Sequence, residues 1–170
     1  MPAKKYLKAQ NGFTAEQAAT VVSTGNANGG DVVALDDTGR LDASVLPVGV
    51  GADVATIKAS EALGAGDFVN IYALSGAAAV RKADASITGQ EAHGYVLAAV
   101  ASGAAATIYF DGRNTSVTGQ TPGNVFLSAT VPGKATATCP TGSGQLQQRL
   151  GIAVAATEIN FEAVTPIILA

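Results

Sequence analysis

Charged side chains are scarce in this chain of 170 residues, at 14% of the sequence, and tryptophan is absent. A soluble monomer normally covers its apolar interior with a polar surface, and so few charges leave apolar surface without such cover. An ordinary monomer with a fully polar surface is therefore disfavoured. We expect part of the surface to be buried against copies of the same chain or against other proteins.

Basic residues are particularly few. The chain has 10 Lys and Arg against 13 Asp and Glu, a formal net charge of −3. A protein that binds nucleic acid as its main ligand needs a basic face to neutralise phosphates, so we expect no nucleic-acid partner. The one basic cluster, Lys4, Lys5 and Lys8, is typical of a solvated chain end, although it would also suit a phosphate or an acidic partner.

Long hydrophobic runs and paired cysteines are missing too. No run approaches the roughly 18 apolar residues of a membrane-spanning helix. The first residues lack the apolar segment of a signal peptide. Cys139 is the only cysteine and has no partner for an internal disulfide. We expect a protein made in the cytoplasm, without membrane contact, that is stabilised by packing and assembly.

The sequence also lacks a convincing catalytic or metal-binding set. His93 is the only histidine, and no Gly-x-Ser-x-Gly elbow accompanies it. Asp36, Asp37 and Asp42 lack the alternate spacing of a calcium loop and are typical of turns. His93 and Cys139 together fall short of a zinc site. We predict no enzymatic activity, no metal and no cofactor, with His93 facing solvent at a strand end.

What the chain does contain is a series of short apolar runs separated by glycine-containing turns. No segment after residue 53 keeps a helical period over three turns. This pattern is typical of all-β sandwiches and small barrels, and that is the fold class we predict. The expected strands are residues 54–59, 67–72, 78–82, 94–100, 104–110, 124–129, 134–139, 148–155 and 158–162, with an extended tail at 166–169.

One stretch of this pattern is especially regular. Residues 93–111 hold two apolar runs on either side of Ser102-Gly103. Glycine supplies the positive φ of a tight turn, so we interpret the stretch as a hairpin. Residues 150–161 repeat its composition in shortened form.

Glycines recur at a fixed spacing in this region. Gly94 and Gly151 are 57 residues apart, and so are Gly66 and Gly123. A repeated spacing indicates that one β unit is used twice, with coincidence in an Ala- and Gly-rich chain as the alternative. Two such units would pair into one closed barrel and remove most exposed strand edges. The predicted pseudo-repeat comprises residues 65–111 and 122–162 of a β domain at 53–170.

Residues 1–50 have a different character and are predicted to form an extended N-terminal arm. Lysines along a short edge strand discourage wrong pairing. A loop rich in Gly and Asn and a type I turn punctuate the arm, and a flexible linker at 48–52 ends it. The expected elements are an edge strand at 3–9, irregular or extended chain at 14–22, a loop at 25–30, a strand at 32–35, a turn at 36–39 and one helical turn at 41–46.

Both ends of the chain carry candidate interface residues. The last residues, from Thr165 on, are apolar. Chain ends usually fray unless they are tied down, so an apolar end is expected to dock in a core or a subunit interface. The predicted interface residues are Lys4, Lys5, Tyr6, Leu7, Leu41, Val45 and Leu46 in the arm and Ile167, Ile168 and Leu169 in the tail.

Three passages resemble proteins of tailed bacteriophages. Residues 30–47 are similar to a virion-protein segment in which Leu-x-x-Ser-x-Leu-Pro precedes a β domain. Residues 65–109 resemble capsid decoration (cement) proteins, with Ala-Gly-Asp, Lys-Ala-Asp and Gly-led hydrophobic motifs in the same order. The second predicted unit resembles phage fibre modules, with Thr-Pro-Gly at 121–123 and Leu-Ser-x-Thr at 127–130.

The resemblance implies a virion structural protein that is assembled in the host cytoplasm and lies on the outer capsid surface. Such proteins form homo-oligomers, often trimers, that bridge subunits of the major capsid protein and so stabilise the capsid. No catalytic residues are implied. The doubled unit departs from single-unit cement proteins, so a head-fibre, tail-fibre or spike component for host attachment is the alternative.

Overall fold

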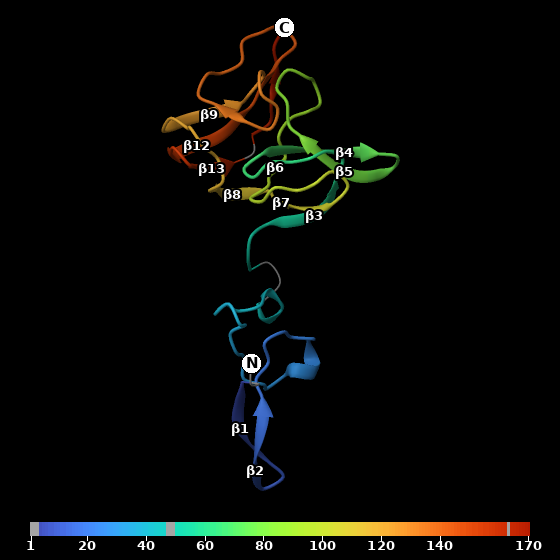
Figure 1. Ribbon diagram of the computed structural model, residues 1–170, viewed down its shortest axis with the longest axis vertical. Helices are drawn as coiled ribbons and strands as arrows, with labels where there is room; N and C mark the ends of the chain where they lie inside the picture. Colours follow the sequence, from blue (N-terminus) through green and yellow to red (C-terminus); the bar gives the residue numbers. More distant parts are fainter. Residues whose placement is uncertain (1–3, 47–49, 163) are drawn as a thin grey trace. The chain divides into compact units, whose positions relative to one another are not determined.

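The computed structural model describes residues 4–46, 50–162 and 164–170 (Figure 1). The chain divides into two compact units, Met1–Gly51 and Ala52–Ala170, which we call the arm and the body. The fold is all-β, as predicted, and the helical segments of the described residues are two 3₁₀ turns of three residues each. No helix among these residues is long and apolar enough to cross a membrane.

The arm begins with a β-hairpin. Strands β1 (Lys5–Gln10) and β2 (Phe13–Ala18) pair antiparallel over their whole length. Asn11 and Gly12 connect them, and both have positive φ, at 52° and 83°. Such two-residue loops match the twist of a hairpin, and Asn-Gly is the strongest short signal for them. Strand β1 corresponds to the edge strand predicted at 3–9, and β2 lies largely within residues 14–22, which were predicted to be irregular or extended.

Two 3₁₀ turns, η1 (Asn26–Asn28) and η2 (Ala43–Val45), follow in the arm. Turn η2 lies within the helical turn predicted for 41–46. Asp42 caps it, because its carboxylate accepts a hydrogen bond from the Ser44 N–H at 2.9 Å.

The strand predicted at 32–35 is absent and is replaced by a single parallel bridge between Thr20 and Val33. Thr20 makes both main-chain hydrogen bonds of this bridge, with Val32 and Ala34, at 2.9 Å each. The chain bends directly after Thr20. No second partner residue follows, so a ladder cannot extend.

The first half of the body is a closed barrel with the strand order β3-β5-β4-β6-β7. Strand β3 pairs antiparallel with β7 on one side and parallel with β5 on the other. The barrel therefore closes within this half alone and not by pairing of the two predicted repeats. The closing strand is β3, which precedes the first predicted repeat and pairs with both β5 and β7. The strands are β3 (Val54–Ala59), β4 (Phe68–Leu74), β5 (Ala77–Lys82), β6 (Gly94–Tyr95) and β7 (Ala105–Tyr109).

The second half contains a five-stranded sheet with the order β10-β9-β12-β13-β8. The first half has the same order when its closed barrel is written as β5-β4-β6-β7-β3. In each half the third strand along the chain is followed by the second, fourth, fifth and first. A doubled unit would give this match. Strands β3 and β8 begin at positions 54 and 111, again 57 residues apart. The strands are β8 (Asp111–Asn114), β9 (Gly123–Leu127), β10 (Ala135–Thr136), β12 (Arg149–Ala155) and β13 (Glu158–Glu162), beside a small sheet of β11 (Leu146–Gln147) and β14 (Ile167–Ile168).

The two halves differ in how they close. In the second sheet β8 and β10 are edge strands that do not pair with each other. The start of β4 lies between them. The Asn114 side chain donates to the Gly66 carbonyl at 3.0 Å, and the Phe68 N–H donates to the Gly133 carbonyl at 2.8 Å. The second sheet therefore closes on the first half, and the body is one interlocked unit.

Two apolar clusters fill the body. One lies inside the first barrel, around Val69, Val80 and Ile108. The other is shared by both halves, and in it Phe68 contacts Phe161 with ring centroids 5.5 Å apart. Tyr95 also packs here and donates to the Asp111 carbonyl at 3.1 Å. Burial raises the pKa of Tyr95 to about 12, so its hydroxyl stays neutral.

Two expected strands are much shorter than predicted. The strand expected at 94–100 ends at Tyr95, because Val96 turns to bond with Gly66 and Asp67, outside the ladder. The strand expected at 134–139 is reduced to β10. The Thr138 N–H donates to the Thr136 hydroxyl at 3.1 Å, a local turn that ends pairing. The turn predicted at Ser102-Gly103 is present, and Gly103 has a φ of 83°. The hairpin predicted across it is not formed as expected, because β6 and β7 pair only at Tyr95 and Tyr109 and Val100 bridges to Leu63 instead.

Candidate functional site

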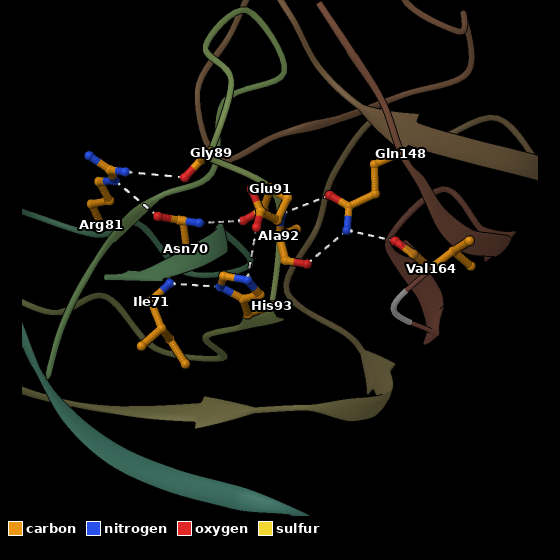
Figure 2. Close-up of polar contacts among 9 residues, drawn as sticks. All are labelled: Asn70, Ile71, Arg81, Gly89, Glu91, Ala92, His93, Gln148 and Val164. Carbon is orange, nitrogen blue, oxygen red and sulfur yellow. Dashed lines mark hydrogen bonds and ion pairs between the residues drawn. The ribbon is translucent and has the colours of Figure 1, made fainter. Parts of the chain in front are cut away.

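His93 lies directly before β6, at the edge of a hollow of about 290 Å³ that is also lined by Glu91, Gln148 and Thr165. Its Nδ1 accepts a hydrogen bond from the Ile71 N–H at 3.0 Å, and its Nε2 lies 3.4 Å from a Glu91 carboxylate oxygen (Figure 2). A main-chain N–H only donates. Nδ1 is therefore unprotonated, and the ring proton is on Nε2, facing Glu91.

This arrangement corrects the expectation of a histidine that simply faces solvent. A histidine beside a carboxylate in a hollow is the arrangement that would favour an acid–base site. A general base, however, needs a free nitrogen within reach of the proton that it takes. Both nitrogens of His93 have partners within the chain, so the geometry holds the ring in place and leaves neither nitrogen free for a substrate.

Gln148 holds the same segment from the other side. It is 2% exposed, and its Oε1 accepts from the Ala92 N–H at 2.7 Å while its Nε2 donates to the Ala92 carbonyl at 2.9 Å. Nε2 also donates to the Val164 carbonyl at 3.0 Å (Figure 2). The Gln148 side chain thus makes the two main-chain hydrogen bonds with Ala92 that a neighbouring strand would otherwise make. It also holds Val164, directly before the tail, in place.

Asn70 and Arg81, opposite each other on β4 and β5, complete the network. Asn70 donates to the Glu91 carbonyl at 2.9 Å and accepts from Arg81 Nε at 3.0 Å. Arg81 also donates to the Gly89 carbonyl at 3.3 Å. Asn70, Arg81 and the Ile71 N–H thus hold residues 89–93, the segment before β6, on the barrel, while Gln148 holds it from the second half (Figure 2).

An ion pair between the buried Asp67 and the half-exposed Lys134 links the two halves of the body. Asp67 is 1% exposed; one carboxylate oxygen accepts from the Gly64 N–H at 2.7 Å and the other lies 2.5 Å from Lys134 Nζ. The sequence placed Asp67 only at the start of the predicted strand 67–72 and in the Ala-Gly-Asp motif. The sequence did carry a signal for this pair, namely an aspartate within an otherwise apolar strand, because a buried carboxylate requires a partner.

The acidic residues of the arm form turns, as predicted. Asp36 accepts hydrogen bonds from the N–H groups of Arg40 and Thr38, at 2.9 and 2.8 Å. The Arg40 bond is the main cause that lowers the pKa of Asp36, and the bond from Ser44 lowers that of Asp42. In the described part of the chain, no group of three or more His, Cys, Asp or Glu residues is placed to hold a metal ion.

Asp31 is the centre of a polar cluster in the arm. Its carboxylate, 14% exposed, accepts from the Thr20 hydroxyl at 2.9 Å and the Asn28 amide at 3.2 Å. Lys8 Nζ lies 3.9 Å away. The hydrogen bonds from Asn28 and then Thr20 lower the pKa of Asp31. The arm is therefore held together by polar contacts.

Three of the predicted interface residues have partners inside the arm. Lys4 donates to the carbonyls of Leu35 and Asp36. Lys5 forms an ion pair with Glu16 across the hairpin at 2.7 Å. The Tyr6 hydroxyl lies 3.4 Å from Asp31. Lys4 and Lys5 remain exposed, as expected of a solvated basic end, but their charged groups have partners within the arm.

The apolar residues predicted for the interface are mostly exposed. Leu7, Leu41 and Leu46 are exposed, and Val45 is half-buried beside a small polar hollow. Among the described residues of the arm, no apolar side chain is buried. The exposed large ones are Leu7, Phe13, Val22, Val32, Val33, Leu35, Leu41, Leu46 and Val50.

The tail is docked by its main chain. Strand β14 pairs antiparallel with β11, and Leu169 exchanges further main-chain bonds with Gly144 and Gln145. The side chains of Ile167 and Ile168 are 61% and 58% exposed, while Leu169 is half-buried. The tail thus leaves two isoleucines on the surface.

No protein-family model, curated protein or solved structure matches this chain.

Proposed function

We propose that this chain is a structural protein of a tailed-phage virion, which decorates the outer capsid surface and bridges subunits of the major capsid protein. The observation that carries the proposal is the arm, where nine large apolar side chains are exposed and none among the described residues is buried. Such a surface needs a partner to cover it. The polar groups around His93 have hydrogen-bond or ion-pair partners within the chain, which favours a structural binding role over catalysis.

The proposed mechanism is mechanical. The chain forms a homo-oligomer, a trimer by the resemblance to cement proteins, and each copy contacts the capsid. Several linked contacts bind far more tightly than any one alone, so modest contacts repeated by symmetry hold an expanded capsid together. Neither nucleic acid nor membrane is a partner in this proposal, because the net charge of −3 provides no extended basic face.

The test is binding of the purified full chain to DNA-free, expanded phage capsids and to unexpanded ones, followed by sedimentation. We expect saturable binding to the expanded form and a higher melting temperature of the decorated capsid. Absence of binding to both forms would overturn the proposal.

Binding to host cells or glycans instead would favour the fibre or spike alternative. Receptor-binding tips commonly present exposed aromatic side chains. The four tyrosines, Tyr6, Tyr72, Tyr95 and Tyr109, are buried or half-buried, but Phe13 in the arm is 78% exposed, so exposed aromatic side chains do not distinguish the two proposals and the binding test decides between them.

A further inference from the structure

The arm contains the dipeptide Asn-Gly twice, in two different surroundings. Asn11-Gly12 is the exposed loop between β1 and β2, whereas Asn28-Gly29 lies at the end of the 3₁₀ turn η1. Asparagine is chemically labile. It deamidates most readily before glycine, because the attacking main-chain nitrogen is not shielded by a Cβ on the same residue. The local sequence therefore makes both asparagines equal candidates for this modification.

The side chain of Asn11 is free, whereas that of Asn28 is held. The Asn11 amide makes no hydrogen bond within the described part of the chain. Asn28 Oδ1 accepts from the Thr24 N–H at 2.7 Å and from the Thr24 hydroxyl at 2.9 Å. Asn28 Nδ2 donates to the Asp31 carboxylate at 3.2 Å. Asn28 must break these bonds before its side chain can turn toward the next main-chain nitrogen.

The two glycine nitrogens differ in the same direction. The Gly29 N–H donates to the Asn26 carbonyl at 3.2 Å, and a Cβ added at Gly29 would lie 3.3 Å from that oxygen. The Gly12 N–H has no main-chain partner among the described residues, and the space where its Cβ would be is open to 4 Å. A two-stranded hairpin is also marginally stable in water, so its loop opens readily. The Gly12 nitrogen is therefore the accessible one.

We propose that Asn11 is a site of spontaneous deamidation, and that the contacts of Asn28 protect it from the same reaction. Hydroxide removes the proton of the Gly12 nitrogen, which attacks Asn11 Cγ. A new N–C bond forms, the bond from Cγ to Nδ2 breaks, and ammonia leaves. Water then opens the resulting succinimide ring at either of its carbonyl carbons. The product is aspartate or isoaspartate, and the net reaction consumes one water and releases one ammonia.

The two products differ in their effect on the hairpin. Asp-Gly also suits a two-residue loop with positive φ, so aspartate leaves β1 and β2 paired. Isoaspartate passes the main chain through the former side chain and lengthens the loop by one carbon atom. The pair of Gln10 and Phe13, which closes the loop, then loses its register. We expect the isoaspartyl chain alone to lose pairing next to the loop.

The experiment incubates the purified full chain at mildly alkaline pH, folded and in urea, and follows both sites by peptide mass spectrometry. In the folded chain Asn11 should react faster than Asn28 by about tenfold or more, because broken hydrogen bonds add to the barrier at Asn28. In urea the two sites should react at similar rates, since only the local sequence then acts. Asn11→Gln is the control and should not react at this position, because glutamine would have to form a less favourable six-membered ring.

Three results would overturn the inference. These are an Asn28 that reacts as fast as Asn11 in the folded chain, an Asn11 that reacts only in urea, and a difference between the sites that is as large in urea as in the folded chain. The last result would show that sequence and not structure selects the site.

Amide hydrogen exchange on the separated products tests the effect on the hairpin. Amides next to the loop should lose protection in the isoaspartyl chain and keep it in the aspartyl chain. Asn11→Asp is the matched variant for the aspartyl product and should also keep it. Equal protection in the two products would contradict the proposed loss of pairing.

Discussion

Gln148 shows how one polar side chain can replace part of a sheet. Its amide satisfies both main-chain groups of Ala92 and the carbonyl of Val164. A buried amide without partners is costly, but here the amide oxygen and nitrogen are both bonded. The residue therefore stabilises the segment before β6 and the start of the tail together.

Replacing Gln148 should destabilise the body. In Gln148→Leu, three main-chain groups lose their partner at once, and we expect a loss of about 2–4 kcal/mol in the free energy of unfolding, measured with urea. The control is Gln147→Leu, at the neighbouring half-buried position. Equal stability of the two variants would contradict the role assigned to Gln148.

Asp31 makes the arm sensitive to acid. Its pKa in the folded chain lies below the ordinary value of 3.8, because Asn28 and Thr20 donate to the carboxylate. The carboxylate therefore stabilises the arm above about pH 4, and this contribution is lost as the pH falls through the folded-state pKa. Asp36 and Asp42 act in the same direction.

We expect the amides of the arm to lose protection as the pH falls below about 4, as followed by NMR. Asp31→Asn should reduce this change. Asp37→Asn is the control, since no hydrogen bond to the Asp37 side chain is found among the described residues. An acid response that Asp31→Asn leaves intact would show that other carboxylates carry it.

Strands β6 and β12 both need a residue without a side chain where they cross the next strand. Gly94 and Gly151, which are 57 residues apart, occupy these two positions. At each position, an added Cβ would meet a main-chain carbonyl oxygen of the next strand, that of Tyr109 in β7 or of Asn160 in β13. Main chain cannot rotate away as a side chain can. Glycine at both positions therefore permits the same close crossing of strands in each half.

Gly94→Ala should consequently be costly. We expect a loss of about 3 kcal/mol in unfolding free energy, since overpacking against main chain forces a backbone shift. In Gly103→Ala the added methyl group has open space and only the positive φ is unfavourable, so about 1 kcal/mol is expected. Comparable losses in the two variants would argue against a close crossing at Gly94.

The two halves of the body should unfold together. They share one apolar cluster that joins Phe68 to Phe161, and the Asp67–Lys134 pair and the Asn114–Gly66 bond link them further. The second sheet has no closing strand of its own. Neither half can lose its structure without exposing buried surface of the other.

We therefore expect one cooperative transition for the body. The amides of Ile108 in β7 and Ile159 in β13 should show the same urea midpoint and the same slope in native-state hydrogen exchange. Two separate midpoints would indicate that each half folds independently.

The sequence by itself determined the all-β class, the turn at Ser102-Gly103 and the 57-residue spacing. Each depends on local chemistry or on simple periodicity along the chain. The Asn11-Gly12 turn was equally readable, because its signal is also local. The tail pairs with β11 through its main chain, but docking of Ile167 and Ile168 in the core of the body is wrong, because both side chains face outward; their place in a subunit interface stays a prediction.

Only the tertiary structure decided how the sheets close, which partners hold His93 and Asp67, and that Lys4 and Lys5 are engaged inside the arm. These contacts join residues far apart in the chain, as Ala92 and Gln148 are, 56 positions apart. Hydrogen-bond partners at such distances follow from the path of the whole chain. Composition and spacing indicate that a buried polar group needs a partner, but the fold selects which one it has.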